Sequence, residues 1–265
     1  MDYLLLILAG IVQGLTEFLP VSSSAHLILL PVITGREDQG LVYDIAAHLG
    51  SLAAVLFYFR QDLRRLLFAW FRSLAGSEST QDARIVWYVL LATLPVVVFG
   101  FVFYEVVAGI FRDPVIIAVA TIGFGALLWW ADHRGKQQLD VQSLTAGKAL
   151  YIGLAQAIAL VPGTSRSGIT ITAGLLFGFS RTEAARFSFY LSIPTIVMAA
   201  AYSFYHVYGT TISPDPAGFF LVFFVSAISA WIAISLFLAF VEKIGMLPFV
   251  IYRLLLGGLL LYFYL

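Results

Sequence analysis

Two polar stretches interrupt strongly apolar runs of the chain, and they carry the residues that could do chemistry. The first, residues 13–26, contains Glu17, three consecutive serines and His26. The second, residues 162–170, contains Arg166 among several hydroxyl side chains. Ionisable side chains are expensive at membrane depth and usually mark functional sites. We therefore expect the two stretches to meet and to form one phosphate-handling site.

Arg166 is the centre of the second stretch. Its guanidinium is a rigid fork that matches phosphate oxygens, and a helix starting near Ser165 would direct free backbone amides at the same anion. The residues that we assign to phosphate binding here are Gly163, Ser165, Ser167 and Thr170. The structural alternative is an arginine that satisfies carbonyl groups or an acidic partner inside the protein.

The serines and the imidazole of the first stretch suit phosphoryl transfer. His26 lies three residues after Ser23, so a helix beginning near Ser23 would place both on one face. A serine nucleophile with a histidine base is the mechanism that we favour, and direct attack by the histidine is the alternative. Ser22 and Ser24 are further expected phosphate contacts. A histidine that is only hydrogen-bonded within a helix bundle is the structural alternative.

Glu17 and Gln13 lie four residues apart and would share one face of the preceding half-helix. A carboxylate buried at this depth needs a cation, a hydrogen-bond partner or a proton. A divalent ion such as Mg²⁺ or Ca²⁺ would fit, with diphosphate oxygens filling its coordination shell. An ion pair of Glu17 with Arg166 or Arg253 is the alternative, and it can coexist with a metal.

Three further polar residues each allow two roles. Asp44 and His48 lie one helical turn apart at the start of an apolar run, and a structural role is slightly favoured over support of the site. Arg253 lies a few residues inside the last apolar run, where reaching the membrane interface and contacting a ligand are equally reasonable.

The elements that must hold these residues are membrane helices. Of the 265 residues, 61% are hydrophobic and 11% are charged, and the mean hydropathy is +0.94, well above that of soluble domains. The fifteen basic and fifteen acidic residues cancel, so charge gives no support for a nucleic-acid partner. Cysteine is absent, which excludes disulfides and thiolate catalysis.

Six apolar runs are long enough for a bilayer crossing, which takes roughly 20 residues. They cover residues 41–59, 85–104, 114–131, 187–207, 217–240 and 247–265. Two other runs, 3–33 and 149–178, are broken by proline and hydroxyl residues. Because such breaks persist at membrane depth only where protein or water covers them, we expect two re-entrant, broken helix pairs.

Charge placement and an internal repeat predict the topology. Four arginines within residues 60–72 follow the first span and predict a cytoplasmic loop. The sequence Gly-Ile-Val-Gln at 10–13 and the sequence Gly-Leu-Ala-Gln at 153–156 each precede a break. The expected fold is all-α, a polytopic membrane protein whose whole chain is one domain, with an inverted-topology repeat of 1–133 and 146–265.

With these motifs the chain closely resembles the integral-membrane undecaprenyl-diphosphate phosphatases, also called bacitracin-resistance proteins. Residues 13–26 resemble the family's glutamate-rich signature, and residues 162–167 resemble its Pro-Gly-x-Ser-Arg-Ser signature. The resemblance covers essentially the whole chain. Gln13 stands where many members carry a glutamate, which leaves Glu17 as the only carboxylate of that motif, and Ala25 replaces a commoner glycine.

The resemblance implies hydrolysis of undecaprenyl diphosphate to undecaprenyl phosphate and inorganic phosphate. This reaction recycles the lipid carrier for peptidoglycan and envelope polymers and confers bacitracin resistance. It also implies a divalent-cation requirement and a bacterial plasma (inner) membrane protein whose site opens to the periplasm or the outside. A lipid-phosphate flippase or transporter is the alternative, because inverted repeats with broken helices are common in carriers. The expected partners are the polyprenyl diphosphate substrate and membrane lipids, without nucleic acid, and a homodimer is compatible with the sequence.

Overall fold

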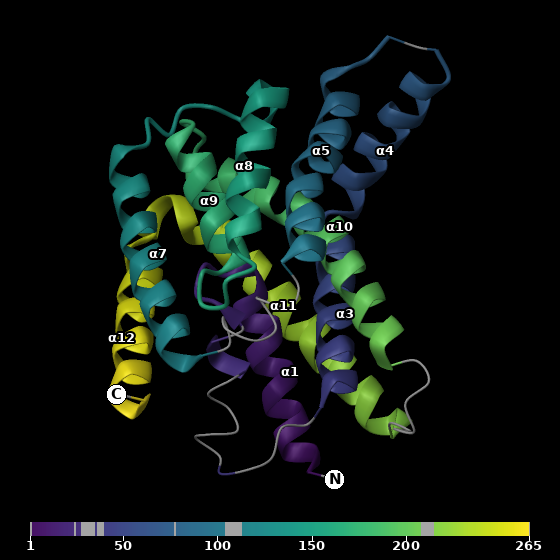
Figure 1. Cartoon of the computed structure of the whole chain (residues 1–265). Coiled ribbons are helices and arrows are strands. Elements are labelled where there is room, and N and C mark those ends of the chain that lie inside the picture. The colour runs from purple at the N-terminus through teal and green to yellow at the C-terminus, as the bar shows by residue number, and fades with distance from the viewer. Residues whose placement is uncertain are drawn as a thin grey trace.

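The computed structural model describes residues 2–23, 25–27, 35, 40–76, 78–103, 113–207 and 215–264. Within these ranges the chain is built from helices, and the only β-type pairing is an isolated bridge between Leu139 and Phe179. The start of the first helix and the end of the last lie toward the same end of the molecule (Figure 1).

Among the described residues, six helices are long and apolar enough to cross a membrane. They are α3 (Leu41–Tyr58), α5 (Gln81–Val102), α7 (Pro114–Arg134), α10 (Arg181–Val207), α11 (Pro216–Ile244) and α12 (Leu247–Tyr264). Each of them overlaps one of the six predicted spans, so the all-α, multi-pass membrane class is confirmed.

Three shorter helices flank the two predicted breaks. Helix α1 (Tyr3–Phe18) ends just before Pro20, while α8 (Ala146–Ile158), after the 3₁₀ turn η2 (Val141–Ser143), and α9 (Arg166–Leu176) flank the second break. The 16 residues of α1 extend over only about 24 Å, less than the roughly 30 Å of a hydrocarbon core. Helices α8 and α9 enter from the opposite end to α1 (Figure 1). Residues 28–34, which complete the first predicted pair, lie outside the described ranges, and the inverted repeat stays a prediction.

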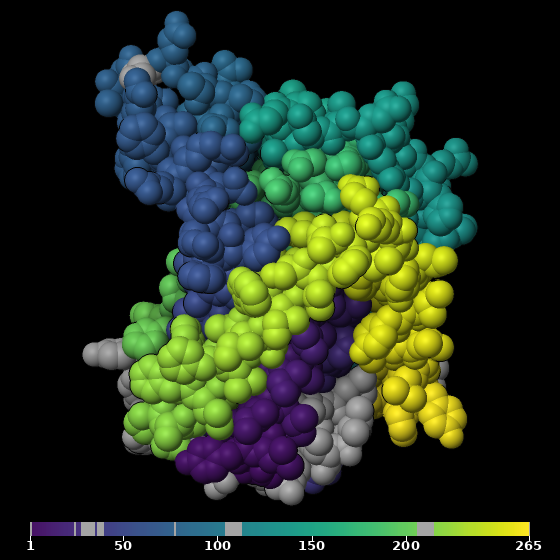
Figure 2. All heavy atoms as spheres, turned by 180° about the vertical axis from the view of Figure 1, so that it is seen from behind, coloured from purple at the N-terminus to yellow at the C-terminus, as the bar shows by residue number. Residues whose placement is uncertain are grey.

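The arginine-rich segment after α3 is a helix, whereas the sequence analysis treated it as a loop. Helix α4 (Arg60–Leu74) contains no proline or glycine, and its apolar residues recur at helical spacing. Leu66 is buried, but Phe68 and Phe71 are 64% and 60% exposed. The helix stands apart from the main bundle together with the start of α5 (Figure 1 and Figure 2).

Each broken helix packs tightly against a spanning helix through a glycine. A Cβ atom on Gly14 of α1 would lie 2.5 Å from the Ser226 carbonyl oxygen of α11, and one on Gly153 of α8 would lie 2.4 Å from the Ala92 carbonyl oxygen of α5. Such close backbone approach is typical of helix pairs in membranes. Figure 2 shows α1 and α11 side by side across one face. These contacts fix the position of the break that follows each of the two helices.

Polar contacts tie the helix ends together outside the apolar core. Arg181 of α10 makes a two-point ion pair with Asp132 of α7, at 2.6 and 3.1 Å, and the Met246 amide donates to the same carboxylate at 3.2 Å. At the other end the Tyr3 hydroxyl donates to Asp215 at 2.9 Å, and this hydrogen bond lowers the pKa of the Asp215 carboxyl. The helices around the two breaks are therefore connected by polar contacts at both ends of the bundle.

Candidate active site

The two breaks meet, as the sequence predicted. The Ser167 hydroxyl at the start of α9 donates to the Leu19 carbonyl at the end of α1, at 2.8 Å. Ser165 is the N-cap of α9, and its hydroxyl accepts from the Gly168 amide at 3.1 Å. The predicted helix start near Ser165 is confirmed, and the amino end of α9 is thereby fixed beside the first break.

Arg253 of α12 holds both breaks from behind. Its guanidinium donates to the carbonyl of Pro20 in the first break at 3.4 Å, and to those of Gly163 and Thr164 in the second at 3.0 and 2.9 Å. Its Nε donates to the Thr121 carbonyl of α7 at 3.1 Å. The side chain is 0% exposed, so it does not reach the membrane interface, and it does not line the cavity described next.

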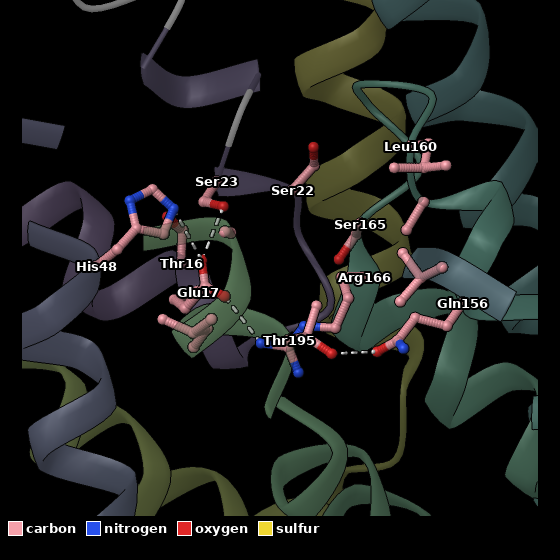
Figure 3. A pocket seen from close by; sticks show the side chains of 14 residues that line it. Thr16, Glu17, Ser22, Ser23, His48, Gln156, Leu160, Ser165, Arg166 and Thr195 are labelled. Atoms are coloured by element: carbon pink, nitrogen blue, oxygen red, sulfur yellow. Dashed lines mark hydrogen bonds and ion pairs between the residues drawn. The ribbon is translucent and has the colours of Figure 1, made fainter. Parts of the chain in front are cut away.

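A cavity of about 280 Å³ lies between the breaks (Figure 3). Its polar lining comes from the two breaks and from α1, α3, α8 and α10. The polar residues are Thr16, Glu17, Ser22, Ser23, His48, Gln156, Ser165, Arg166 and Thr195. The predicted residues Glu17, Ser22, Ser23, Ser165 and Arg166 are thus brought together around one space.

An ion pair between the two halves of the chain crosses this cavity. An Arg166 terminal nitrogen lies 2.8 Å from Glu17 Oε1, and the two side chains are 13% and 9% exposed. Glu17 Oε2 accepts from Gln13 Nε2 at 2.8 Å and from the Ser23 hydroxyl at 3.2 Å. Arg166 also donates to the Ser188 carbonyl at 3.1 Å. Arg166 therefore has both an acidic partner and a carbonyl partner inside the protein, as the structural alternative predicted. It also lines the cavity.

Two serines of the site have an unusual backbone conformation. Ser22 has φ 74° and Ser165 has φ 68°, both in the left-handed region that residues other than glycine rarely adopt. One lies in each break, and both line the cavity. Strained backbone of this kind concentrates at functional sites.

The two histidines near the site have different surroundings. His26 does not line the cavity, because its Nε2 lies 2.6 Å from the Tyr252 hydroxyl and its Nδ1 lies 2.7 Å from the Ser22 carbonyl oxygen. His48 lines the cavity, with Nε2 4.0 Å from Glu17 Oε2. Its Nδ1 lies 2.8 Å from the Asp44 carbonyl oxygen, which can only accept. In the neutral ring Nδ1 therefore carries the proton, and Nε2 faces the cavity as a base.

Some predicted site residues lie behind the cavity wall. Gly163, Ser167 and Thr170 do not line it: the Gly163 carbonyl accepts from Arg253, and the Thr170 hydroxyl lies 2.7 Å from that of Ser188. Gln13 is fully buried beside Glu17. Ser24 falls outside the described residues. The roles predicted for these residues stay predictions.

Sequence reasoning missed three polar side chains of the cavity, Thr16, Gln156 and Thr195. Gln156 of α8 is fully buried, its Oε1 accepts from Thr195 of α10 at 3.3 Å, and its Nε2 has no hydrogen-bond partner among the described residues. An unused buried donor in the cavity wall suits an anionic ligand. The internal repeat held the signal, because it aligned Gln156 with Gln13 of the first motif.

The described residues offer few ligands for a metal ion. Within them no three histidine, aspartate or glutamate residues cluster, and both oxygens of Glu17 already accept hydrogen bonds. Gln13 Oε1 is buried without a partner in the described part of the chain. The Glu17 carboxylate and Gln13 Oε1 can therefore hold a divalent ion only if a ligand such as a diphosphate supplies the rest of the ion's coordination shell.

Fold and site together define a multi-pass helical membrane protein in which two helix breaks enclose a cavity lined by an arginine, a glutamate and several hydroxyl side chains. The family model described as bacitracin resistance protein BacA matches residues 6–259, and the chain belongs to this family. It is 53% identical over 264 residues to undecaprenyl-diphosphatase 2 of Stutzerimonas stutzeri, with 98% of each chain covered. It is 50% identical over 264 residues to undecaprenyl-diphosphatase of Nitrosococcus oceani, with both chains fully covered. A third relative, undecaprenyl-diphosphatase of Teredinibacter turnerae, is 47% identical over 260 residues, with 98% of each chain covered.

Removing the Arg253 guanidinium is expected to destabilise the whole site. The Arg253→Met change leaves four buried carbonyls short of a donor, which should lower the free energy of unfolding by about 2–4 kcal/mol. Arg253→Lys should be intermediate, because one ammonium cannot reach carbonyls from three segments. The measurement is the midpoint of thermal unfolding in detergent, with Arg134→Met at the exposed end of α7 as the control. Unchanged midpoints for both Arg253 variants would contradict this role.

Proposed function

We propose that this protein hydrolyses undecaprenyl diphosphate to undecaprenyl phosphate and inorganic phosphate. The reaction returns the lipid carrier to peptidoglycan and envelope polymer synthesis and thereby confers bacitracin resistance. The observation that carries the proposal is the convergence of Arg166, Glu17 and Ser23 on one cavity inside the membrane-spanning bundle. The relatives named undecaprenyl-diphosphatase support it over nearly the full chain.

Arg166 and the amino end of α9 hold the diphosphate. The guanidinium has five N–H donors, and its contacts with Glu17 and Ser188 leave others for phosphate oxygens. The α9 terminus adds backbone amides and a partial positive charge. Gln156 Nε2 supplies a further donor. Phosphoryl transfer needs mainly such positioning and charge neutralisation.

Ser23 is the nucleophile. Glu17 orients its hydroxyl through the 3.2 Å hydrogen bond, and Ser23 Oγ attacks the terminal phosphorus while the bond to the bridging oxygen breaks. Undecaprenyl phosphate leaves, and water then releases inorganic phosphate from the phosphoserine. The sequence assigned the base to His26; we assign it to His48, whose bare Nε2 faces the cavity 4.0 Å from Glu17. His48 takes the serine proton and later activates the water.

A divalent cation is the cofactor that we expect at this site. Glu17 and the free Oε1 of Gln13 are the residues that would hold it. When bound, the ion neutralises the non-bridging phosphate oxygens. The arginines of α4 support a cytoplasmic position for that end of the bundle. The proposal places the protein in a bacterial inner membrane, with the cavity open to the periplasmic side.

Changes at the phosphate contact and the nucleophile are expected to abolish turnover. Arg166→Lys keeps the charge but loses the planar fork, so phosphate release should fall roughly 100-fold. Ser23→Ala should reduce it at least as far and remove an acid-stable phosphoprotein trapped by rapid quench. Purified protein in detergent is assayed, with Arg134→Lys and Ser235→Ala as controls. Near-normal turnover of both site variants would refute the proposal, and so would lipid movement without phosphate production, as a flippase predicts.

The two histidines are separated by matched glutamine substitutions. His48→Gln should slow phosphate release roughly 100-fold, because a general base is lost. His26→Gln should change the rate less than about threefold, because its ring is turned to Tyr252. The reverse order of effects would return the base role to His26, and an acid-labile, base-stable phosphoprotein would make a histidine the nucleophile.

Metal removal tests the cation. Treatment with a chelator should lower phosphate release at least roughly tenfold, because the diphosphate charge is then neutralised only by Arg166 and the amino end of α9. Adding Mg²⁺ or Ca²⁺ back should restore the rate. Full activity in chelator, after metal analysis shows that the protein and the substrate are free of divalent ions, would exclude the requirement.

A further inference from the structure

Two apolar grooves of similar size lie on the outer surface of the helix bundle. The α5–α8 groove, about 330 Å³, is lined by Phe99 and Phe103 at the end of α5 and by residues within 154–161. The α3–α11 groove, about 310 Å³, is lined by residues within 53–57 and 223–231. Apolar grooves alone say little in a membrane protein, because lipid chains can fill any of them.

The α5–α8 groove differs from the other because it continues into the polar cavity. Leu160 lines both spaces, and the α3–α11 groove shares no lining residue with the cavity among those described. Val96 of α5 lines the cavity, and Phe99 of α5 and its C-cap residue Phe103 line the groove. These positions, three and seven residues apart, form one stripe of a helix. An apolar path therefore leads out of the polar cavity along α5.

The two sides of the cavity are lined by different residues. His48 and Ser23 lie on one side of it, and Gln156 and Leu160 lie on the opposite side (Figure 3). The phosphate under attack must lie next to Ser23. If Ser23 is the nucleophile, the phosphate that carries the lipid lies toward Gln156 and its unused Nε2, on the side of the cavity that Leu160 lines.

We propose that the first isoprene units of the polyprenyl chain bind in the α5–α8 groove, so that the substrate leaves the cavity past Leu160. This inference rests on the proposed function and adds the site of its lipid part. The chemistry matches, because branched aliphatic and aromatic side chains pack well against an isoprenoid, whereas the cavity between the breaks is polar. Only the first units lie in the groove, and the remainder of the chain stays in the bilayer.

The test compares a long and a short substrate on a variant with a filled groove. Ala157, half-buried in the α5–α8 groove, is changed to Trp, and phosphate release is measured with undecaprenyl diphosphate and with dimethylallyl diphosphate. For the long substrate KM should rise roughly tenfold or more. For the single-unit substrate kcat/KM should stay within about twofold, because its chain ends near Leu160.

A matched control and a second variant complete the experiment. Ala227→Trp fills the α3–α11 groove from an equally half-buried alanine and should leave both substrates unchanged. Phe99→Ala removes a groove wall without adding bulk and should raise KM for the long substrate alone, which covers a failure of the Trp variant to fold.

The outcomes separate this inference from the proposed function. Equal effects on both substrates, no effect of either groove variant, or the same effect from Ala227→Trp would overturn the assignment of the groove to the polyprenyl chain. Wild-type protein that releases no phosphate from either substrate would instead overturn the proposed function.

Discussion

A helix that stops inside a membrane leaves backbone carbonyls without partners, and lipid cannot supply them. Every feature of this site depends on how the protein meets that constraint. Arg253 provides donors for carbonyls of both breaks, and Ser167 provides another for the end of α1. A single buried cation surrounded by carbonyl dipoles thus replaces the missing helical hydrogen bonds. Only because the breaks are covered in this way can they hold polar side chains at the same depth.

The second layer of the arrangement is electrostatic. Glu17 and Arg166 come from different halves of the chain and neutralise each other at 2.8 Å. Burying such a pair costs more desolvation energy than an apolar pair would, so its presence at the cavity indicates a use beyond stability. In the proposed mechanism an incoming diphosphate competes for the same guanidinium, while Glu17 keeps its hydrogen bond with Ser23. In that mechanism the diphosphate replaces Glu17 as the anionic partner of Arg166.

Much of this could be predicted from the sequence. Hydropathy located all six spans, and the proline and hydroxyl residues located both breaks, because membrane crossing imposes a minimum apolar length on each segment. Helix α4 was missed as a helix, because its arginines were interpreted only as a topology signal. Its amphipathic spacing was present in the sequence and would have predicted the helix.

The sequence could not predict which histidine lines the cavity. The spacing of Ser23 and His26 predicts that both lie on one helix face. It does not predict how that face is oriented relative to α12, where the His26 ring contacts the Tyr252 hydroxyl. His48 reaches the cavity only through the packing of α3 beside α1. The role of Arg253 was hidden for a related reason, since its partners are main-chain atoms of three distant segments, and no residue type in the sequence marks them.

The left-handed serines have a consequence for how this protein can change over time. Ser22 and Ser165 hold a conformation that glycine would adopt with less strain, and such strain costs on the order of 1–3 kcal/mol per residue. Stability and catalysis therefore make opposite demands at these two positions. A glycine would relieve the backbone strain, but it would remove a hydroxyl from the cavity and, at position 165, the side-chain cap of α9. Of the three described residues other than glycine that have a positive φ, two line the cavity and the third, Gln137, does not. Backbone strain at a functional cavity is the usual form of a stability–activity trade-off.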